Sequence, residues 1–168
     1  SISNERTVPK GSVLIRQGRP VDMVFFVTDG CLRSFFIDRH GKEHTLHFAI
    51  RNNWISDYIA IHSNESATLT VECLTESSII EFDTEKIYGM LTMFPELEPF
   101  QRANLERLFI SLQKRIINQL HLSAAERYDL FLEEYPDVEQ HIPNYHIASY
   151  LGITQESLSR IRANKSRT

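Results

Sequence analysis

Residues 143–164 have the spacing of two short helices joined by a tight turn, and this pattern constrains the fold more than any other part of the chain. Gly152 stands between the two, where a helix end favours a residue that tolerates a positive φ. Thr154 follows where its hydroxyl can cap the second helix, and Ala148 is small where the two helices must cross closely. The apolar positions at helical spacing are Ile147, Ala148, Leu151, Leu158 and Ile161. This pattern predicts a helix-turn-helix, whose second helix enters the major groove of DNA.

The alternative is an ordinary helical hairpin, because the chain as a whole is acidic, with a formal net charge of −4. Local charge favours DNA binding, since Glu156 is the only acid after His146 while arginines and lysines cluster there. With the apolar side chains inside, the polar ones should face base edges, and the last cations should suit phosphates. The residues expected to bind DNA are Thr154, Gln155, Glu156, Ser157, Ser159, Arg160, Arg162 and Lys165, with Arg167 as a further phosphate contact.

Composition narrows the class of protein. The 168 residues are 42% hydrophobic and 24% charged, which is typical of a soluble globular protein. Neither a membrane span nor a secretory segment is evident, so a cytoplasmic protein without membrane contact is expected. Cys31 and Cys73 are too few for a disulfide framework and cannot supply the four thiolates of an iron–sulfur cluster within one chain.

The N-terminal half is expected to be an antiparallel barrel or sandwich. Segments rich in β-branched and aromatic residues recur at short intervals, divided by glycine-containing turns. The strands are expected at residues 13–15, 23–27, 32–37, 44–49, 68–73 and 78–82. Together with the helical C-terminal half, they predict an α+β fold.

A long helix is expected from about residue 96 to residue 120, where apolar residues recur every three or four positions. It could pack on its own barrel or form a seam between two chains, and its length favours the seam because a small barrel cannot cover it. The dimer contacts are expected at Leu105, Leu108, Leu112 and Ile116. Asp83 should cap a preceding short helix, and Ser123 with Glu126 forms a capping box for the next.

A barrel, a long helix and a helix-turn-helix in this order resemble the family of the cyclic-AMP receptor protein and the fumarate–nitrate regulator, the Crp/Fnr family. The residues that carry the resemblance lie in segments 9–14, 17–18, 25–33, 41–43, 125–128, 147–154 and 158–161. The resemblance implies a DNA-binding transcriptional regulator, commonly a homodimer, with an effector-sensing barrel of the double-stranded β-helix or jelly-roll type. RNA polymerase is a further candidate partner. The family's Ser/Thr-Arg-Glu-Thr-Val-x-Arg pattern matches residues 154–160, with Gln155 in place of the first arginine.

The effector pocket departs from the nucleotide-binding members of this family. Those members carry a Gly-Glu-Leu segment and a later Arg-Ser/Thr-Ala, in which the arginine pairs with the phosphate. Aligned without gaps, this chain has Ser56, Asp57 and Tyr58 at the first segment, and Ala67 in place of the arginine. A buried phosphate without a cation is costly, so cyclic AMP is not the expected effector. The predicted pocket residues are Arg33 (a substitute cation), Trp54, Ser56, Asp57, Tyr58, Ala67 and Thr68.

Metal binding and catalysis have less support in the sequence. His40, His44 and His47 could suggest a metal, but residues 44 and 47 of a strand point to opposite faces, so no metal site and no enzyme are expected. A redox role of the cysteines and the effector's identity are left open. The predicted domains are a sensor barrel at 1–95, a dimerisation helix at 96–121 and a helix-turn-helix domain at 122–168. A ligand-binding barrel whose helical tail binds protein instead of DNA is the alternative function.

Overall fold

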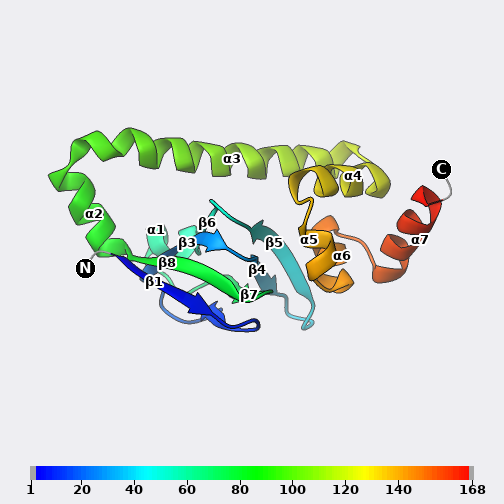
Figure 1. Cartoon of the computed structure of the whole chain (residues 1–168), viewed down its shortest axis with the longest axis horizontal. Coiled ribbons are helices and arrows are strands. Elements are labelled where there is room, and N and C mark those ends of the chain that lie inside the picture. Colours follow the sequence, from blue (N-terminus) through cyan, green and yellow to red (C-terminus); the bar gives the residue numbers. More distant parts are fainter. Residues whose placement is uncertain (1–2, 167–168) are drawn as a thin grey trace.

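The computed structural model describes residues 3–166, which form a β-sandwich followed by helices (Figure 1). The strands are β1 (Ser3–Val8), β2 (Val13–Ile15), β3 (Met23–Asp29), β4 (Leu32–Ile37), β5 (Glu43–Ala49), β6 (Trp54–Ile55), β7 (Thr70–Cys73) and β8 (Ser77–Asp83). The helices are α1 (Tyr58–Ser63), α2 (Thr84–Met93), a 3-10 turn (Pro95–Leu97), α3 (Glu98–His121), α4 (Ala124–Glu134), α5 (Val138–His141), α6 (Asn144–Leu151) and α7 (Gln155–Lys165).

The strands make two four-stranded sheets whose neighbouring strands are all antiparallel, in the orders β1-β8-β3-β6 and β2-β7-β4-β5. The core between the sheets is aliphatic and aromatic. Val27 of β3 and Ile79 of β8 are direct cross-strand partners, and both are fully buried in it together with Leu32 of β4. The predicted jelly-roll barrel of an α+β protein is therefore confirmed.

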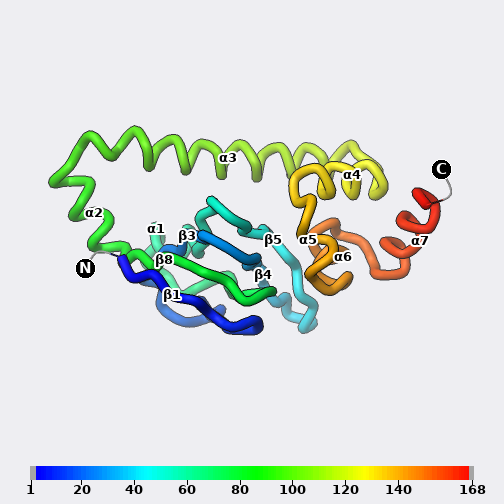
Figure 2. The backbone as a smooth tube through the Cα atoms, in the orientation of Figure 1, coloured from blue at the N-terminus to red at the C-terminus, as the bar shows by residue number. Residues whose placement is uncertain are grey.

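Helix α3 extends along one side of the sandwich, and α2 connects it to β8 (Figure 2). Asp83 caps α2 as predicted, since its carboxylate accepts a hydrogen bond from the backbone N–H of Lys86 at 3.1 Å. No residue of α3 is fully buried, although many are apolar. A 24-residue helix with this pattern has more apolar surface than its own chain covers.

The C-terminal helices begin with the predicted capping box. The hydroxyl of Ser123 accepts from the N–H of Glu126 at 3.3 Å, and the Glu126 carboxylate accepts from the N–H of Ser123 at 2.8 Å. These hydrogen bonds satisfy two of the donors that a helix start leaves open. They lower the pKa of the Glu126 carboxyl, the side-chain bond with Ser123 having the largest effect.

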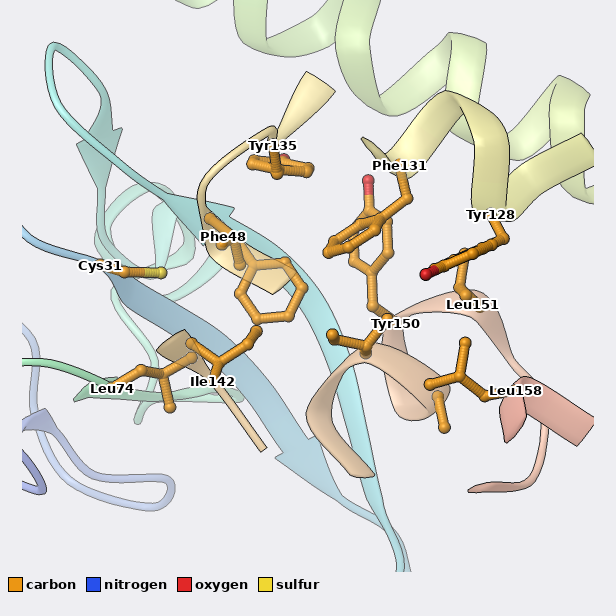
Figure 3. Packing of buried hydrophobic residues seen from close by; sticks show 13 residues of the cluster. Cys31, Phe48, Leu74, Tyr128, Phe131, Tyr135, Ile142, Tyr150, Leu151 and Leu158 are labelled. Carbon is orange, nitrogen blue, oxygen red and sulfur yellow. The ribbon is translucent and has the colours of Figure 1, made fainter. Parts of the chain in front are cut away.

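The C-terminal helices and the barrel share one core, drawn in Figure 3. Phe48 of β5 lies at its centre, and its ring centroid is 6.0 Å from Phe131 of α4, 5.7 Å from Tyr135 and 5.2 Å from Tyr150 of α6. Cys31 and Leu74 extend this core on the barrel side. The C-terminal region therefore packs directly on the outer face of a barrel sheet, in addition to following the long helix along the chain.

Four short elements were not predicted from the sequence. They are β1, β6, α1 and α5, and they contain between two and six residues each. Strand β1 is almost wholly exposed and pairs only with β8, so no apolar alternation marks it. Segments this short carry too little periodicity to identify them from sequence.

Candidate functional site

The turn between α6 and α7 has the geometry that the sequence predicted. Gly152 ends α6 with a φ of 69°, and the backbone N–H of Ile153 donates to the carbonyl of Ala148 at 3.0 Å. Thr154 caps α7, accepting from the N–H of Ser157 at 3.2 Å. A side chain at Gly152 would be strained by this φ, and its Cβ would also approach Gln119 to 3.0 Å.

Helix α7 has one buried face and one polar face. Leu158 is fully buried, and Ile161 packs beside it. The exposed side chains are Thr154, Gln155, Glu156, Ser159, Arg160 and Lys165, whereas Ser157 is half-buried. Hydrogen bonds, first from the Glu156 backbone and then from Thr154, lower the pKa of the Glu156 carboxyl, so it is ionised at neutral pH. The face therefore carries an acid, an amide, hydroxyls and an arginine, which suit base edges.

Arg162 lies on the inner side of α7, contrary to its predicted place among the phosphate contacts. Its Nε is 2.8 Å from a carboxylate oxygen of Glu139, and its Nη1 donates to Asn144 at 2.6 Å. Its Nε also donates to the hydroxyl of Tyr128 at 3.0 Å. Its Nε and Nη1 are bonded within the domain and its Nη2 is shielded from solvent, so this guanidinium is turned inward rather than toward a phosphate.

Lys165 remains about half exposed while it forms an ion pair with Asp129 of α4. Exposed ion pairs contribute little to stability, so this ammonium can exchange its partner at low cost. Arg160 is exposed and donates to the hydroxyl of Ser157 at 3.3 Å. Arg167, the further predicted phosphate contact, lies outside the described residues.

Two polar residues that sequence reasoning missed connect the helix-turn-helix to the barrel. The hydroxyl of Ser149 accepts from the N–H of Thr45 at 2.8 Å and donates to the carbonyl of Glu43 at 2.9 Å. Arg115 of α3 donates to the carbonyls of Leu46, of Thr45 at 3.0 Å and of Tyr150 at 2.8 Å. No local sequence signal marks either residue, because the partners in β5 are far away along the chain.

The position that nucleotide-binding relatives use for their ligand holds an internal carboxylate here. Asp57 is fully buried and caps α1 by accepting from the N–H of Ala60 at 3.1 Å. Its other oxygen accepts from the N–H of Thr68 at 2.6 Å, the Thr68 hydroxyl at 2.9 Å and the N–H of Leu69 at 2.8 Å. Ser56 donates to the carbonyl of Met23 at 2.8 Å, and Ala67 is buried in the barrel core. These donors, which could hold an anion, are therefore satisfied by the protein itself.

Arg33 is not brought to this site. Its direct cross-strand partner is Phe48, which belongs to the core outside the barrel, so both side chains lie on the outer face of the sheet. The guanidinium is buried and donates to Glu72 and to Glu43, at 2.6 Å in each case. Since it already has two carboxylates, Arg33 does not supply the cation missing beside Asp57.

A cavity of about 530 Å³ lies between the barrel and the helices α2 and α3. Trp54 and Tyr58, from the predicted pocket, line it, whereas Ser56, Asp57, Ala67 and Thr68 do not. Most of its wall is apolar, formed by Val24, Ile50, Phe82, Ile87, Met90, Leu91, Leu97, Phe100, Leu105 and Leu108. Burial lowers the pKa of His47, which also lines it, to about 4, so this imidazole is neutral at pH 7.

The residues of the predicted dimer seam do not share one face of α3. Leu108 lines the cavity, and Leu105 lies at its edge while remaining partly exposed. The opposite side of the helix carries Phe109, Ile116 and Leu120, with 64%, 62% and 82% of their surface exposed. Leu105 and Leu112 fall on the same stripe as these three, because the five positions recur every three or four residues.

Neither the cysteines nor the histidines form a reactive cluster. Cys31 belongs to the core outside the barrel and Cys73 to the core inside it, so their thiols lie on opposite faces of the sheet. Burial raises the pKa of Cys31 to about 12 and that of Cys73 to about 11. Within residues 3–166, no three His, Cys, Asp or Glu side chains are grouped as a metal site. No helix in this part of the chain is long and apolar enough to cross a membrane.

Comparisons with known proteins agree with this architecture. The profile of the cyclic nucleotide-binding domain matches residues 5–93. The transcriptional activator protein FnrA of Stutzerimonas stutzeri is 23% identical over 171 residues, covering 95% of this chain and 69% of the relative. The cAMP-activated global transcriptional regulator CRP of Escherichia coli O6:H1 is 21% identical over 163 residues, covering 91% of this chain and 78% of the relative.

Among solved structures, FixK2 from Bradyrhizobium japonicum superimposes with a TM-score of 0.83. That likeness covers 98% of this chain and 84% of the other at 17% identity, which shows a common fold. The profile match extends over more than half of the chain, and the relatives extend through the helix-turn-helix. The chain therefore belongs to the cyclic nucleotide-binding domain family and, within it, to the transcription regulators of the Crp/Fnr type.

Proposed function

We propose that this regulator binds double-stranded DNA through the exposed face of α7 and acts by changing transcription rather than by catalysis. The observation that carries the proposal is the division of α7 into a buried face at Leu158 and a polar face at Gln155, Glu156, Ser159 and Arg160. A helix that bound protein would more often expose apolar side chains in its contact surface. The relatives, one named a transcriptional activator and one a global transcriptional regulator, support the DNA partner over a protein partner.

Selection from random duplexes tests this function. The full chain is incubated with a randomised DNA pool, and bound duplexes are recovered and sequenced. We expect one enriched motif and an affinity that falls steeply with salt, because Lys165 should contact phosphates and Arg160 adds positive charge to the same face. Recovery of unenriched DNA, or none, would support the protein-binding alternative.

A homodimer is proposed as the DNA-binding unit. The stripe of Leu105, Phe109, Leu112, Ile116 and Leu120 supports it, because apolar residues at helical spacing, of which all but the half-buried Leu112 are exposed, are typical of a seam between two helices. In this dimer Leu108 lies on the barrel side of α3, and Phe109 and Leu120 join the predicted dimer contacts. Two-fold symmetry then predicts a near-palindromic DNA site with half-sites about 34 Å apart.

The effector is proposed not to be cyclic AMP. Two features support this: Ala67 provides no cation, and Asp57 already accepts the hydrogen bonds of Thr68 and Leu69. A phosphate at this position would lie against a buried carboxylate and would be repelled by it. Calorimetry with cyclic AMP and cyclic GMP tests the point, and affinity no tighter than about 1 mM is expected. Micromolar binding of either would contradict it.

We infer that the effector instead occupies the apolar cavity beside α3, which has the size usual for small-molecule sites. Trp54 is the only tryptophan of the chain and lines this cavity, so its fluorescence reports on occupancy. The dye anilinonaphthalene sulfonate, which carries an anionic sulfonate on an apolar ring system, should change the Trp54 emission, and Leu108→Glu, which places a like charge in the wall, should abolish the change. An unchanged response in that variant would place the dye elsewhere.

Each of the predicted domains is proposed to have its own function. Residues 1–95 sense the effector, residues 96–121 dimerise, and residues 122–168 bind DNA in the cytoplasm. RNA polymerase is a further proposed partner, supported by the relatives that are transcriptional activators.

A further inference from the structure

A second cavity, of about 510 Å³, lies between the second half of α3 and the helices α4 and α6. It is separate from the Asp57 site, and its lining differs in character from that of the first cavity. Four cationic side chains line it, namely Arg107, Lys114, Arg115 and Arg127, against the two acids Glu133 and Glu134. The formal charge of the lining is therefore +2, although the whole chain carries −4.

The positive charges of this cavity are only partly balanced by its two acids. Within residues 3–166, none of the four cations forms an ion pair with a carboxylate. Arg115 is bonded to backbone carbonyls alone, and burial lowers its pKa. Partly buried cations without counter-charges are unfavourable, and an anion in the cavity would offset that cost.

Arg127 lines this cavity with both terminal nitrogens hydrogen-bonded to backbone carbonyls rather than to a carboxylate. Its Nη1 donates to the carbonyl of Leu122 at 2.7 Å and its Nη2 to that of Leu151 at 3.2 Å. Its Nε is shielded from solvent and has no hydrogen-bond partner in the described chain. Because Nε is closed off from solvent, it is closed off from the cavity as well, and Arg127 would act on a ligand through its positive charge rather than through a hydrogen bond from Nε.

The remaining wall is apolar and comes from Ile110, Leu130, Phe131 and Leu151. We propose that this cavity binds a phosphate-bearing small molecule, with its phosphate near Lys114 and Arg127 and its apolar portion against this wall. An ammonium and a guanidinium are the groups that bind phosphate in proteins. The volume suits a molecule of nucleotide size.

Such a ligand would regulate the protein through the placement of its helices. The wall comes from α3, α4 and α6, so the ligand would contact the proposed dimer helix and the helix-turn-helix at once. It could change DNA affinity only by binding one relative arrangement of these helices better than another. This effect rests on the proposed function, whereas binding itself does not.

Calorimetry of the full chain tests the proposal, with ADP and inorganic pyrophosphate as probes and adenosine as the control ligand. ADP should bind at one site per chain, and Lys114→Gln should weaken it about tenfold, since a charge-assisted hydrogen bond to phosphate is lost. The matched control is Lys86→Gln, an exposed lysine of α2 that lines neither cavity, and it should bind ADP as the wild type does. Lys114 is exposed, so its substitution should leave the fold intact.

Four results of the ligand experiments would overturn the assignment. They are no binding of either phosphate probe, equal binding of ADP and adenosine, equal ADP binding by Lys114→Gln and wild type, and a shift of Trp54 emission by ADP, which would place the ligand in the first cavity. Weaker DNA binding by Lys114→Gln without any small molecule would assign the cations to the DNA backbone instead, which also overturns the proposal. DNA binding by the wild-type chain is measured separately, so failure of this site is distinguishable from failure of the proposed function.

Discussion

The hydroxyl of Ser149 accepts a hydrogen bond from the backbone N–H of Thr45, a residue 104 positions earlier in the chain. Ser149 lies on the first helix of the helix-turn-helix, and Thr45 lies on β5, the edge strand of its sheet. An edge strand leaves backbone groups unpaired, and here one of them is satisfied by the DNA-binding region. The position of that region is thereby coupled to the conformation of the barrel.

Ser149→Ala should loosen this contact. The substitution leaves the N–H of Thr45 and the carbonyl of Glu43 without their partner, which should lower the free energy of unfolding by about 1–2 kcal/mol. Urea denaturation measures the loss, and hydrogen exchange should show weaker protection of the Thr45 amide. Ser159→Ala, on the exposed face of α7, is the control and should change stability by less than about 0.5 kcal/mol. Unchanged protection of the Thr45 amide would mean that the contact is dispensable.

Arg115→Met should have a larger effect at the same junction. Three carbonyls, from β5 and α6, lose a charged donor, and hydrogen bonds to charged groups are worth about 1.5–3 kcal/mol each at most. We expect a loss of about 2–4 kcal/mol in denaturant unfolding, since the methionine partly refills the space. Arg102→Met, on the exposed first half of α3, serves as the control. A loss in Arg115→Met no larger than that in the control would contradict this role.

Local signals in the sequence predicted the caps and the turn of the fold. Asp83, Ser123, Glu126 and Thr154 bond to backbone groups within a few residues, so their effect is visible in the chain itself. Gly152 likewise indicates a backbone with positive φ, which few other residues adopt. Such features depend on neighbours in sequence rather than on tertiary packing.

The long-range contacts could not be predicted in the same way. The charge cluster at the C-terminus suggested phosphate binding for Arg162. Its guanidinium instead pairs with Glu139, which lies on the separate short helix α5. Similarly, Leu108 and Phe109 are both apolar and adjacent, so periodicity alone could not tell which faces the barrel. Asp57 is among the predicted effector-pocket residues, yet its partners are amides of the protein's own loop.

Substitution of Arg160 should change DNA binding, whereas substitution of Arg162 should change the stability of the fold. Arg160→Ala removes an exposed guanidinium from the proposed DNA face, which should cost about 1–3 kcal/mol on the selected site and relax the preference for one base. Arg162→Ala should instead lower the free energy of unfolding by about 1–3 kcal/mol, because Glu139 loses its half-buried partner, and leave base preference unchanged. Equal loss on all DNA sequences for Arg160→Ala would place this residue on phosphates.

Ile116→Glu should produce monomers. The substitution places a charge in the middle of the exposed stripe, where a partner helix would otherwise bury it without a counter-ion. Light scattering should give the mass of one chain, 19.5 kDa, while circular dichroism shows that the barrel stays folded. Glu106→Ala, on the exposed side of α3 away from the stripe, is the control and should remain dimeric. A dimeric Ile116→Glu protein would show that the seam lies elsewhere.

Acidification should weaken the packing of the helix-turn-helix on the barrel through His146 of α6. Burial, together with the smaller effects of the charges of Arg33 and Lys10, lowers the pKa of His146 to about 3. Below about pH 6.5 the unfolded chain therefore binds a proton that the folded chain excludes, and stability falls as the pH falls toward 3. Between pH 7 and pH 5 this histidine alone should cost about 2 kcal/mol, and His47 should add to the loss.

Denaturant unfolding of wild type and His146→Gln across that interval measures the effect of this residue. The glutamine keeps a polar side chain in the same place but cannot be protonated, so the decline in unfolding free energy should become shallower. The lowered carboxyl pKa values of Asp38, Asp83, Glu126 and Glu156 act only below about pH 4.5, so they do not contribute in this window. An equally steep decline in His146→Gln would show that the proton is taken up elsewhere.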